Sequence, residues 1–137
     1  MKYLLDTNAC IALINGKPLP VRVRLQSAID RGDDVFVSSV SVFELWYGVT
    51  KSTRTQANAA RVDTFLAGPL SVLPFTGPDA KAAGSLRSQL EAAGRPIGAY
   101  DLLVAGQSLQ HELTLVTANV REFSRVKGLV WEDWAKT

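Results

Sequence analysis

The chain has 137 residues, of which 47% are hydrophobic and 20% are charged, as in ordinary globular proteins. We expect residues 1–137 to form a single domain with its own hydrophobic core. The N-terminal apolar run is too short for a secretion signal, and no stretch reaches membrane-spanning length. The one cysteine, Cys10, cannot form an internal disulfide. These features predict a cytoplasmic protein without membrane contact, and the formal net charge of +2 is compatible with a polyanionic partner.

Short apolar segments alternate with amphipathic ones, which indicates an α/β fold with a mostly parallel sheet of about five strands, flanked by helices on both faces. The expected strands are residues 2–5, 35–38, 70–74, 114–117 and 128–131. The expected helices are residues 7–14, 20–31, 40–50, 54–67, 77–93 and 99–111, with a further turn at 120–125. Gly106 would let the helix over residues 99–111 approach a neighbour closely.

Three carboxylates interrupt apolar segments. Asp6 ends the first strand, Glu44 lies near the start of the third helix, and Asp101 lies in the first turn of the sixth. Burying a charge in such surroundings is unfavourable unless a partner compensates it, and no basic residue adjoins any of the three in sequence. A divalent cation, which prefers oxygen ligands, is the simplest shared partner.

The predicted topology also brings these residues toward one edge of the sheet. Strand ends and the following helix starts share an edge in parallel sheets, which places Asp6, Glu44 and Asn119 together. Asp101 joins them if its helix runs antiparallel to the strands. Each residue also has a purely structural interpretation. Asp6 could cap a helix, Glu44 could close a capping box with Ser41, Asp101 could interact with its helix dipole, and Asn119 could be a turn residue.

Other kinds of site are poorly supported. With one histidine, His111, and one cysteine, a zinc site of the usual type is hard to build, and we expect His111 to serve at the surface or at its helix end. The sequence contains neither a nucleophile elbow nor a phosphate-binding glycine loop. Trp46, Trp131 and Trp134 could stack bases, although packing is the better interpretation for the last two.

The residues resemble the PIN-domain ribonucleases, and most closely the VapC-type toxins of bacterial toxin–antitoxin pairs. The resemblance covers residues 1–134 and rests on the order and spacing of four segments: Leu4-Leu5-Asp6-Thr7-Asn8, residues 41–48 with Glu44, residues 94–105 with Asp101, and residues 115–129 with Asn119.

The resemblance implies a Mg²⁺- or Mn²⁺-dependent endoribonuclease. Asp6, Glu44 and Asp101 match the family's acidic residues, and Asn119 stands where the family often has a fourth acid. Asp6 and Asp101 would be the primary metal ligands, and Glu44 would be either a further ligand or the group that orients the attacking water. Asn119 could still coordinate the metal through its carbonyl oxygen or through water. The resemblance also implies supporting roles for nearby polar and basic residues, which are Thr7 and Thr117 beside the site and Arg87 and Arg95 as RNA-phosphate contacts.

The resemblance further implies partners. These are RNA, with the anticodon loop of tRNA as the leading candidate, and a VapB-like antitoxin whose C-terminal tail would block the metal site, by inserting an Arg. We also expect a homodimer. Residues 40–50 and 54–67 carry more apolar side chains than a small sheet needs, which are Phe43, Trp46, Tyr47, Val62, Phe65 and Leu66.

Three alternatives stay open. A haloacid-dehalogenase-like phosphatase would need a second Asp where this chain has Asn8, and a receiver domain would need an Asp after the strand that ends at Leu73-Pro74-Phe75. A domain that only binds RNA would not need the three carboxylates.

Overall fold

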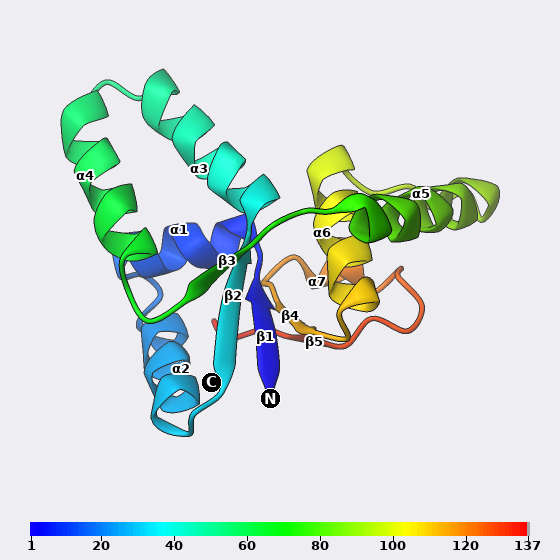
Figure 1. The fold of residues 1–137 in the computed structure, drawn as a ribbon, viewed down its shortest axis with the longest axis horizontal. Helices are drawn as coiled ribbons and strands as arrows, with labels where there is room; N and C mark the ends of the chain where they lie inside the picture. The colour runs from blue at the N-terminus through cyan, green and yellow to red at the C-terminus, as the bar shows by residue number, and fades with distance from the viewer. Residues whose placement is uncertain (137) are drawn as a thin grey trace.

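A computed structural model describes residues 1–136 of the chain. Five strands form one sheet in the order β3-β2-β1-β4-β5, and all four strand pairings are parallel (Figure 1). The strands are β1 Lys2–Leu5, β2 Asp34–Ser38, β3 Ser71–Leu73, β4 Thr114–Val116 and β5 Trp131–Glu132. The helices are α1 Thr7–Asn15, α2 Leu19–Asp30, α3 Ser39–Lys51, α4 Thr55–Leu66, α5 Gly77–Ala92, α6 Ala99–Gln110 and α7 Val120–Phe123. The predicted α/β class with a five-stranded parallel sheet is therefore confirmed.

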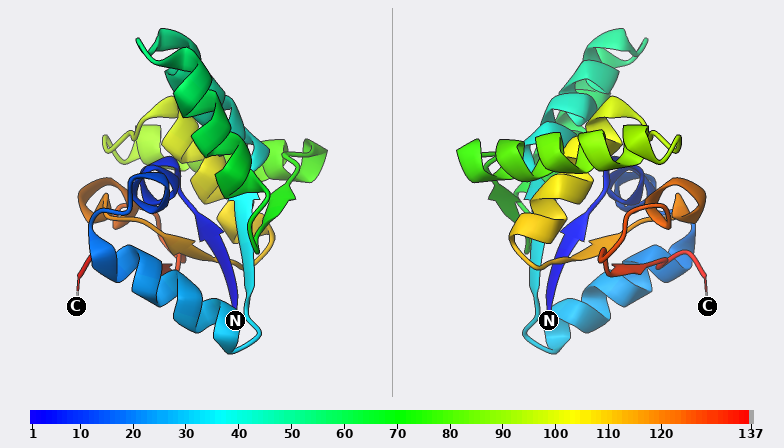
Figure 2. Two further views of the ribbon diagram at one scale, coloured as in Figure 1. Left: turned by 90° about the vertical axis from the view of Figure 1, so that its left-hand side faces the viewer. Right: turned by 90° about the vertical axis from the view of Figure 1, so that its right-hand side faces the viewer.

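The central strand β1 is buried on both faces. Successive side chains of a strand point to opposite faces, and Tyr3 and Leu5 join one hydrophobic cluster while Leu4 joins the other. The first cluster packs under α1, α2, α3 and α4, and the second packs under α5, α6 and α7. The two further views in Figure 2 show these helix groups on either side of the strands. Fully parallel sheets need such cover on both faces.

Two local predictions were wrong. The fifth strand comprises only Trp131–Glu132, later than expected, because Gly128 adopts a positive φ of 83° and makes a turn where the strand was placed. The predicted capping box of Ser41 and Glu44 is absent. Helix α3 begins earlier, and its N-cap is Ser38, whose hydroxyl accepts the Val40 N–H at 3.1 Å.

Trp134, near the C-terminus, and the single cysteine, Cys10, are packed in the core, as predicted. Trp134 is buried and packs edge-on against Tyr3, with ring centroids 5.1 Å apart. Burial raises the pKa of the Cys10 thiol well above its ordinary value, so the thiolate form is disfavoured. Among residues 1–136, no helix is both long and apolar enough to cross a membrane.

Helices α5 and α6 pack face to face, and Gly106 is the point of closest approach, as the sequence predicted. A Cβ atom at this position would lie 2.6 Å from the Cα atom of Ala83. Real Cβ atoms do not approach a backbone so closely, so one helix would have to move. The glycine therefore sets the distance between α5 and the helix that carries Asp101.

Gly106→Ala should destabilise the protein by about 1–3 kcal/mol, because overpacking forces the helices apart. Gly84→Ala is the matched control on α5. A Cβ there meets nothing within 4 Å, so this change should stabilise the helix by roughly 0.5–1 kcal/mol. Urea unfolding of both variants measures the difference, and equal midpoints would contradict the close-approach argument.

Candidate active site

The strand order creates a crevice at one edge of the sheet. From β1 the chain builds β2 and β3 on one side, and then returns to build β4 and β5 on the other. The carboxyl ends of β1 and β4 therefore flank a topological switch point, the usual ligand position in open parallel sheets. Asp6 follows β1, and its N–H donates to the Val116 carbonyl of β4 at 3.0 Å. Thr117 follows β4 and is buried.

Asp6 both caps a helix and faces this crevice. Its Oδ1 accepts the Ala9 N–H of α1 at 2.7 Å, and its side chain is only 3% exposed. Burial raises the pKa of Asp6, and the Glu44 carboxylate adds to that rise. Hydrogen bonds from the Thr117 hydroxyl and the Ala9 amide act in the opposite direction. The capping bond uses one carboxylate oxygen and fixes the direction of the other.

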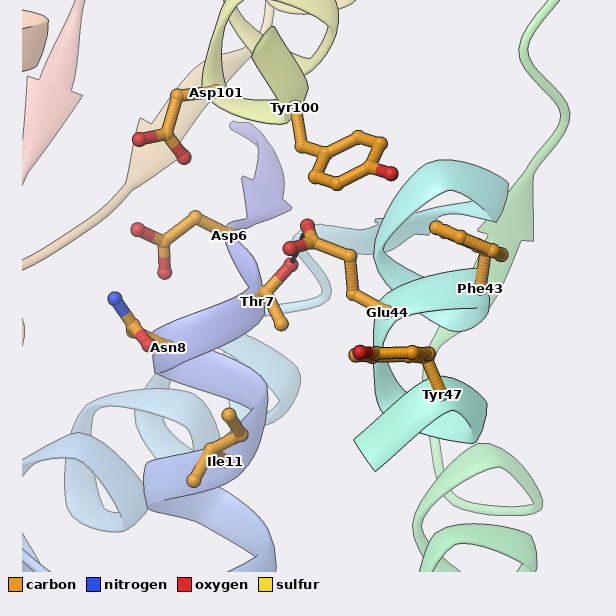
Figure 3. Close-up of a pocket in the computed structure, with 9 residues that line it drawn as sticks. All are labelled: Asp6, Thr7, Asn8, Ile11, Phe43, Glu44, Tyr47, Tyr100 and Asp101. Carbon is orange, nitrogen blue, oxygen red and sulfur yellow. Dashed lines mark hydrogen bonds between the residues drawn. The ribbon is translucent and has the colours of Figure 1, made fainter. Parts of the chain in front are cut away.

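Glu44 is held by a neighbouring hydroxyl. It lies one turn inside α3, where the Thr7 hydroxyl donates to its Oε1 at 2.7 Å (Figure 3). The same hydroxyl oxygen lies 3.0 Å from the Oγ of the buried Ser41. Thr7, predicted as a supporting residue, thus fixes Glu44 from the adjacent helix α1.

Asp101 lies at the same edge because α6 begins there and runs antiparallel to the strands, with Asp101 in its first turn. Burial raises the pKa of Asp101 to about 7, and a hydrogen bond and repulsion from Glu122 contribute. The pKa of Glu122 is lowered by the Asn119 amide first and then by its bond with Asp101. Below about pH 7 the metal-free pair therefore keeps one proton, held mainly on Asp101.

Asn119 faces these acids through its amide nitrogen. Its Nδ2 donates to Glu122 Oε2 at 2.7 Å and lies 3.4 Å from Asp101 Oδ2. The Asn119 N–H donates to Thr117 Oγ1 at 2.9 Å. The amide bridges two carboxylates in this arrangement, and metal ligation by its carbonyl oxygen stays a prediction.

Glu122 is a residue that the sequence analysis missed. It lies in the one-turn helix α7, three residues after Asn119, and residues at that spacing are neighbours on a helix face. The short helix was predicted, so this spacing was the available signal. Glu122 thus places a further carboxylate next to Asn119 and Asp101.

The three predicted carboxylates share one cavity of about 550 Å³. Figure 3 shows Asp6 and Asp101 facing a common space, with Glu44 beside Thr7. Several lining residues were not predicted. The cavity is lined by Asp6, Thr7, Asn8, Ile11, Phe43, Glu44, Tyr47, Tyr100 and Asp101.

The donor set fits a hard divalent cation. Within residues 1–136, the salt bridges do not involve Asp6, Glu44 or Asp101, so these acids have no ion-pair partner there. Over the same residues, no three His, Cys, Asp or Glu side chains lie close enough to hold one ion together. Mg²⁺ commonly binds one or two carboxylates and keeps several waters, so direct contacts from two acids and water-mediated contacts from the others suffice.

The predicted phosphate-binding arginines lie elsewhere. Arg87 pairs with Glu91 on the exposed face of α5 at 3.1 Å, and Arg95 is exposed beyond that helix. Neither lines the carboxylate cavity. The cation beside the acids is Arg125, which donates to the Pro96 carbonyl at 2.9 Å and lowers the pKa of Glu122.

His111 is not simply a surface or helix-end residue. Its Nε2 lies 2.8 Å from Oδ1 of Asp79, which is fully buried at the start of α5. Gln107 Nε2 lies 3.2 Å from the other Asp79 oxygen. These contacts join the C-terminal end of α6 to the start of α5. The other end of α6, its first turn, carries Asp101 and lies at the cavity.

Burial of Asp101, together with its interaction with Glu122, predicts that neutralising Asp101 stabilises the metal-free protein. The folded protein keeps a proton on Asp101 up to about pH 7, whereas the unfolded chain releases it near 3.8. The stabilisation of the folded state by this retained proton is complete at low pH and is lost as the pH rises through about 7. In EDTA, the free energy of unfolding of Asp101→Asn should therefore exceed that of wild type by roughly 1 kcal/mol near pH 8, and by less near pH 5.

Urea unfolding at the two pH values measures this difference. Asp63→Asn, an exposed carboxylate on α4, is the control and should leave the pH dependence unchanged. A variant that is less stable than wild type near pH 8 would show that Asp101 is satisfied without a cation.

Known proteins share this fold and length. Residues 3–129 match the PIN domain family. The chain is 39% identical over 135 residues to the tRNA(fMet)-specific endonuclease VapC of Shigella flexneri, covering 98% of this chain and 99% of the relative. It is 37% identical over 136 residues to ribonuclease VapC2 of Rickettsia felis, covering 99% and 100%.

Solved structures agree. VapBC2 from Rickettsia felis, bound to a DNA fragment from its promoter, aligns with a TM-score of 0.89 at 35% identity, over 96% of this chain and 98% of that one. DNA-bound VapBC from Salmonella typhimurium aligns with a TM-score of 0.89 at 38% identity, over 98% of both chains. The chain therefore belongs to the PIN domain family, and within that family to the VapC toxins.

Proposed function

We propose that the protein is the toxin of a type II toxin–antitoxin pair, and that it hydrolyses RNA phosphodiester bonds with a bound Mg²⁺ or Mn²⁺. The observation that carries this proposal is the convergence of Asp6, Glu44 and Asp101 on one cavity without an ion-pair partner among the described residues. The relatives named as ribonucleases support it. On this proposal a single PIN unit, residues 1–137, acts in the bacterial cytoplasm and inhibits translation and growth.

Each acid has a distinct part in this proposal. Asp6 and Asp101 would hold the cation, which supplies an activated water and polarises the phosphate. Asp6 is directed by its capping bond to Ala9, so it does not reorient when the ligand arrives. Glu44 is fixed by the Thr7 hydroxyl, and its carboxylate would accept a proton from the attacking water.

Glu122 and Asn119 adjust the charge beside Asp101. Glu122 brings a fourth carboxylate to the site, and the Asn119 amide holds it at 2.7 Å. Thr117 joins the two sides of the site, since its hydroxyl accepts the Asn119 N–H and donates to Asp6. Binding a cation here would displace the proton shared by Asp101 and Glu122.

The relatives also suggest a substrate. The Shigella flexneri protein is named a tRNA(fMet)-specific endonuclease, and this chain aligns with 99% of its length. We therefore propose initiator tRNA as the first substrate to test, with cleavage in the anticodon loop that leaves a 5′-phosphate and a 3′-hydroxyl. Mapping the 5′ ends of cellular RNA after brief expression would locate the cut.

An antitoxin groove lies beside the cavity. It runs between α1, α3 and α4, has a volume of about 260 Å³, and is lined by Ile14, Leu45, Gly48, Val49 and Val62 among others. Ile11 and Glu44 line both the groove and the carboxylate cavity, so the two are continuous. A VapB-like tail in the groove would therefore reach the acids, and the solved neighbours of this chain are VapBC complexes.

Fewer apolar side chains are exposed on α3 and α4 than the sequence predicted. Val62 is buried, and Trp46, Phe65 and Leu66 pack partly against the core, which leaves Phe43 and Tyr47 exposed. Homodimer formation therefore stays a prediction, which light scattering of the purified chain would test.

Purified protein should cut tRNA with Mg²⁺ or Mn²⁺ and stop in EDTA. Asp6→Asn and Asp101→Asn should abolish cutting, because each removes a charged ligand, and Glu44→Gln should slow it by about 100-fold or more. Glu122→Gln should weaken Mg²⁺ binding in calorimetry. Asp63→Asn is the control and should retain full activity. Undiminished cutting in excess chelator would overturn metal dependence.

A bulky side chain in the groove should block the antitoxin without harming the nuclease. Gly48 lies in the exposed part of α3, and a Cβ there meets nothing within 4 Å. Gly48→Phe should fold normally, keep cutting RNA, and lose inhibition by the antitoxin encoded beside it. Gly48→Ala is the control and should still be inhibited. Full inhibition of Gly48→Phe would show that the tail binds elsewhere.

A further inference from the structure

The exposed aromatic side chains of this protein gather at the carboxylate cavity. Of its three Trp, three Tyr and five Phe residues, only Phe43, Tyr47 and Tyr100 are exposed, at 52%, 57% and 46%. All three line the cavity that holds the acids. The remaining exposed large hydrophobic residues are aliphatic, so this set, here called the aromatic rim, is a feature of the site and not of the surface in general.

The rim comes from two helices on one side of the cavity. Phe43 and Tyr47 are one turn apart on α3, so they share a face of that helix. Tyr100 lies in the first turn of α6, and its ring centroid is 5.6 Å from that of Phe43 with the planes tilted by 58°. Phe43 and Tyr100 therefore support each other, while Tyr47 stands further along α3 (Figure 3).

A positive charge accompanies the rim. The Lys51 ammonium lies 5.8 Å from the centroid of the Tyr47 ring, one further turn along α3. The cavity itself carries the carboxylates Asp6, Glu44 and Asp101, so a polyanion needs its favourable contacts outside it. Tyr47 with Lys51 offers a flat apolar surface next to a cation, which matches a base next to its phosphate.

We propose that the aromatic rim stacks unpaired bases beside the scissile phosphate, and that Phe43 and Tyr47 thereby position the substrate strand in the site. This inference rests on the proposed ribonuclease function. Base–aromatic stacking needs an open base face, which a duplex hides within its own stack. The buried position of Asp6 favours a strand that can bend into the cavity. Stacking is tolerant of sequence, so the rim positions the strand, and other contacts select the base.

Binding in a nuclease-inactive background separates stacking from chemistry. All variants carry Asp6→Asn, and the probe is a fluorescein-labelled single-stranded oligoribonucleotide of about ten nucleotides, compared with the same strand in a duplex. Tyr47→Ala and Phe43→Ala should each weaken single-strand binding by between about 5-fold and about 150-fold. Binding to the duplex should change little. The fluorescence of a 2-aminopurine in the strand should be quenched when that base stacks on the rim, and Tyr47→Ala and Phe43→Ala should each reduce this quenching.

Conservative variants separate stacking from bulk. Tyr47→Phe keeps the ring and should bind like the parent, whereas Tyr47→Leu keeps apolar volume without a π face and should bind like Tyr47→Ala. Val23→Ala, an exposed apolar residue on α2, is the surface control.

Four outcomes would overturn the proposal. In binding, Tyr47→Leu could bind as well as Tyr47→Phe, or the rim variants could lose as much affinity for the duplex as for the single strand. In light scattering, the rim variants could change the molar mass, which would make the rim a subunit interface. The fourth outcome is a cutting rate that does not depend on the rim. The proposed function fails separately, if the unsubstituted protein does not cut RNA with Mg²⁺. If it cuts but Tyr47→Ala leaves kcat/KM for single strands unchanged, only this inference fails.

Discussion

The burial of carboxylates next to one another is the constraint on which the rest of the structure depends: Asp6 is buried, and Glu44, Asp101 and Glu122 are partly buried. Burial raises the pKa of Asp6, and both burial and Glu122 raise that of Asp101 to about 7. Folding therefore brings together groups that would separate if the backbone allowed it. Asp6 cannot move, because its carboxylate caps α1 and its backbone N–H pairs with β4. Such a site holds charge density for a cation at the expense of stability in its absence, as many functional sites do.

The far end of α6 controls how closely Asp101 approaches Asp6. Gly106 lets α6 lie against Ala83, and Gln107 and His111 both bond to the buried Asp79 of α5. A helix fixed at one end by close packing and polar contacts presents its other end at a defined height above the sheet. The spacing between the acids thus depends on residues that never touch the cavity. Because α6 runs antiparallel to the strands, its first turn, with Asp101, lies at the edge where the strands end.

Much of the fold and the acidic trio was predictable, because both follow from patterns local in sequence. Alternating apolar segments gave the parallel sheet, and Asp6 is tied to the end of β1 by adjacency alone. Asp101 needed one further step, the direction of α6, which the connection to β4 supplies. The capping box failed because Ser38, Ser39 and Ser41 all satisfy the same capping preference, and only the backbone decided that α3 begins at Ser39. Such boundaries depend on strand length, which short sequence patterns leave undetermined.

The sequence could not predict which side chains are exposed, or which side chains distant in sequence contact one another. The spacing of Phe43 and Tyr47 is equally consistent with a helix face that packs against the core. The sequence therefore did not indicate that these two side chains are exposed. In the structure Trp134 and Trp131 pack inward, while the smaller aromatics stand at the cavity. Glu122 matters only because Asn119 holds it beside Asp101. The Asn at position 119 therefore has a carboxylate beside it, since Glu122 follows one helical turn later in the chain and accepts its amide N–H at 2.7 Å.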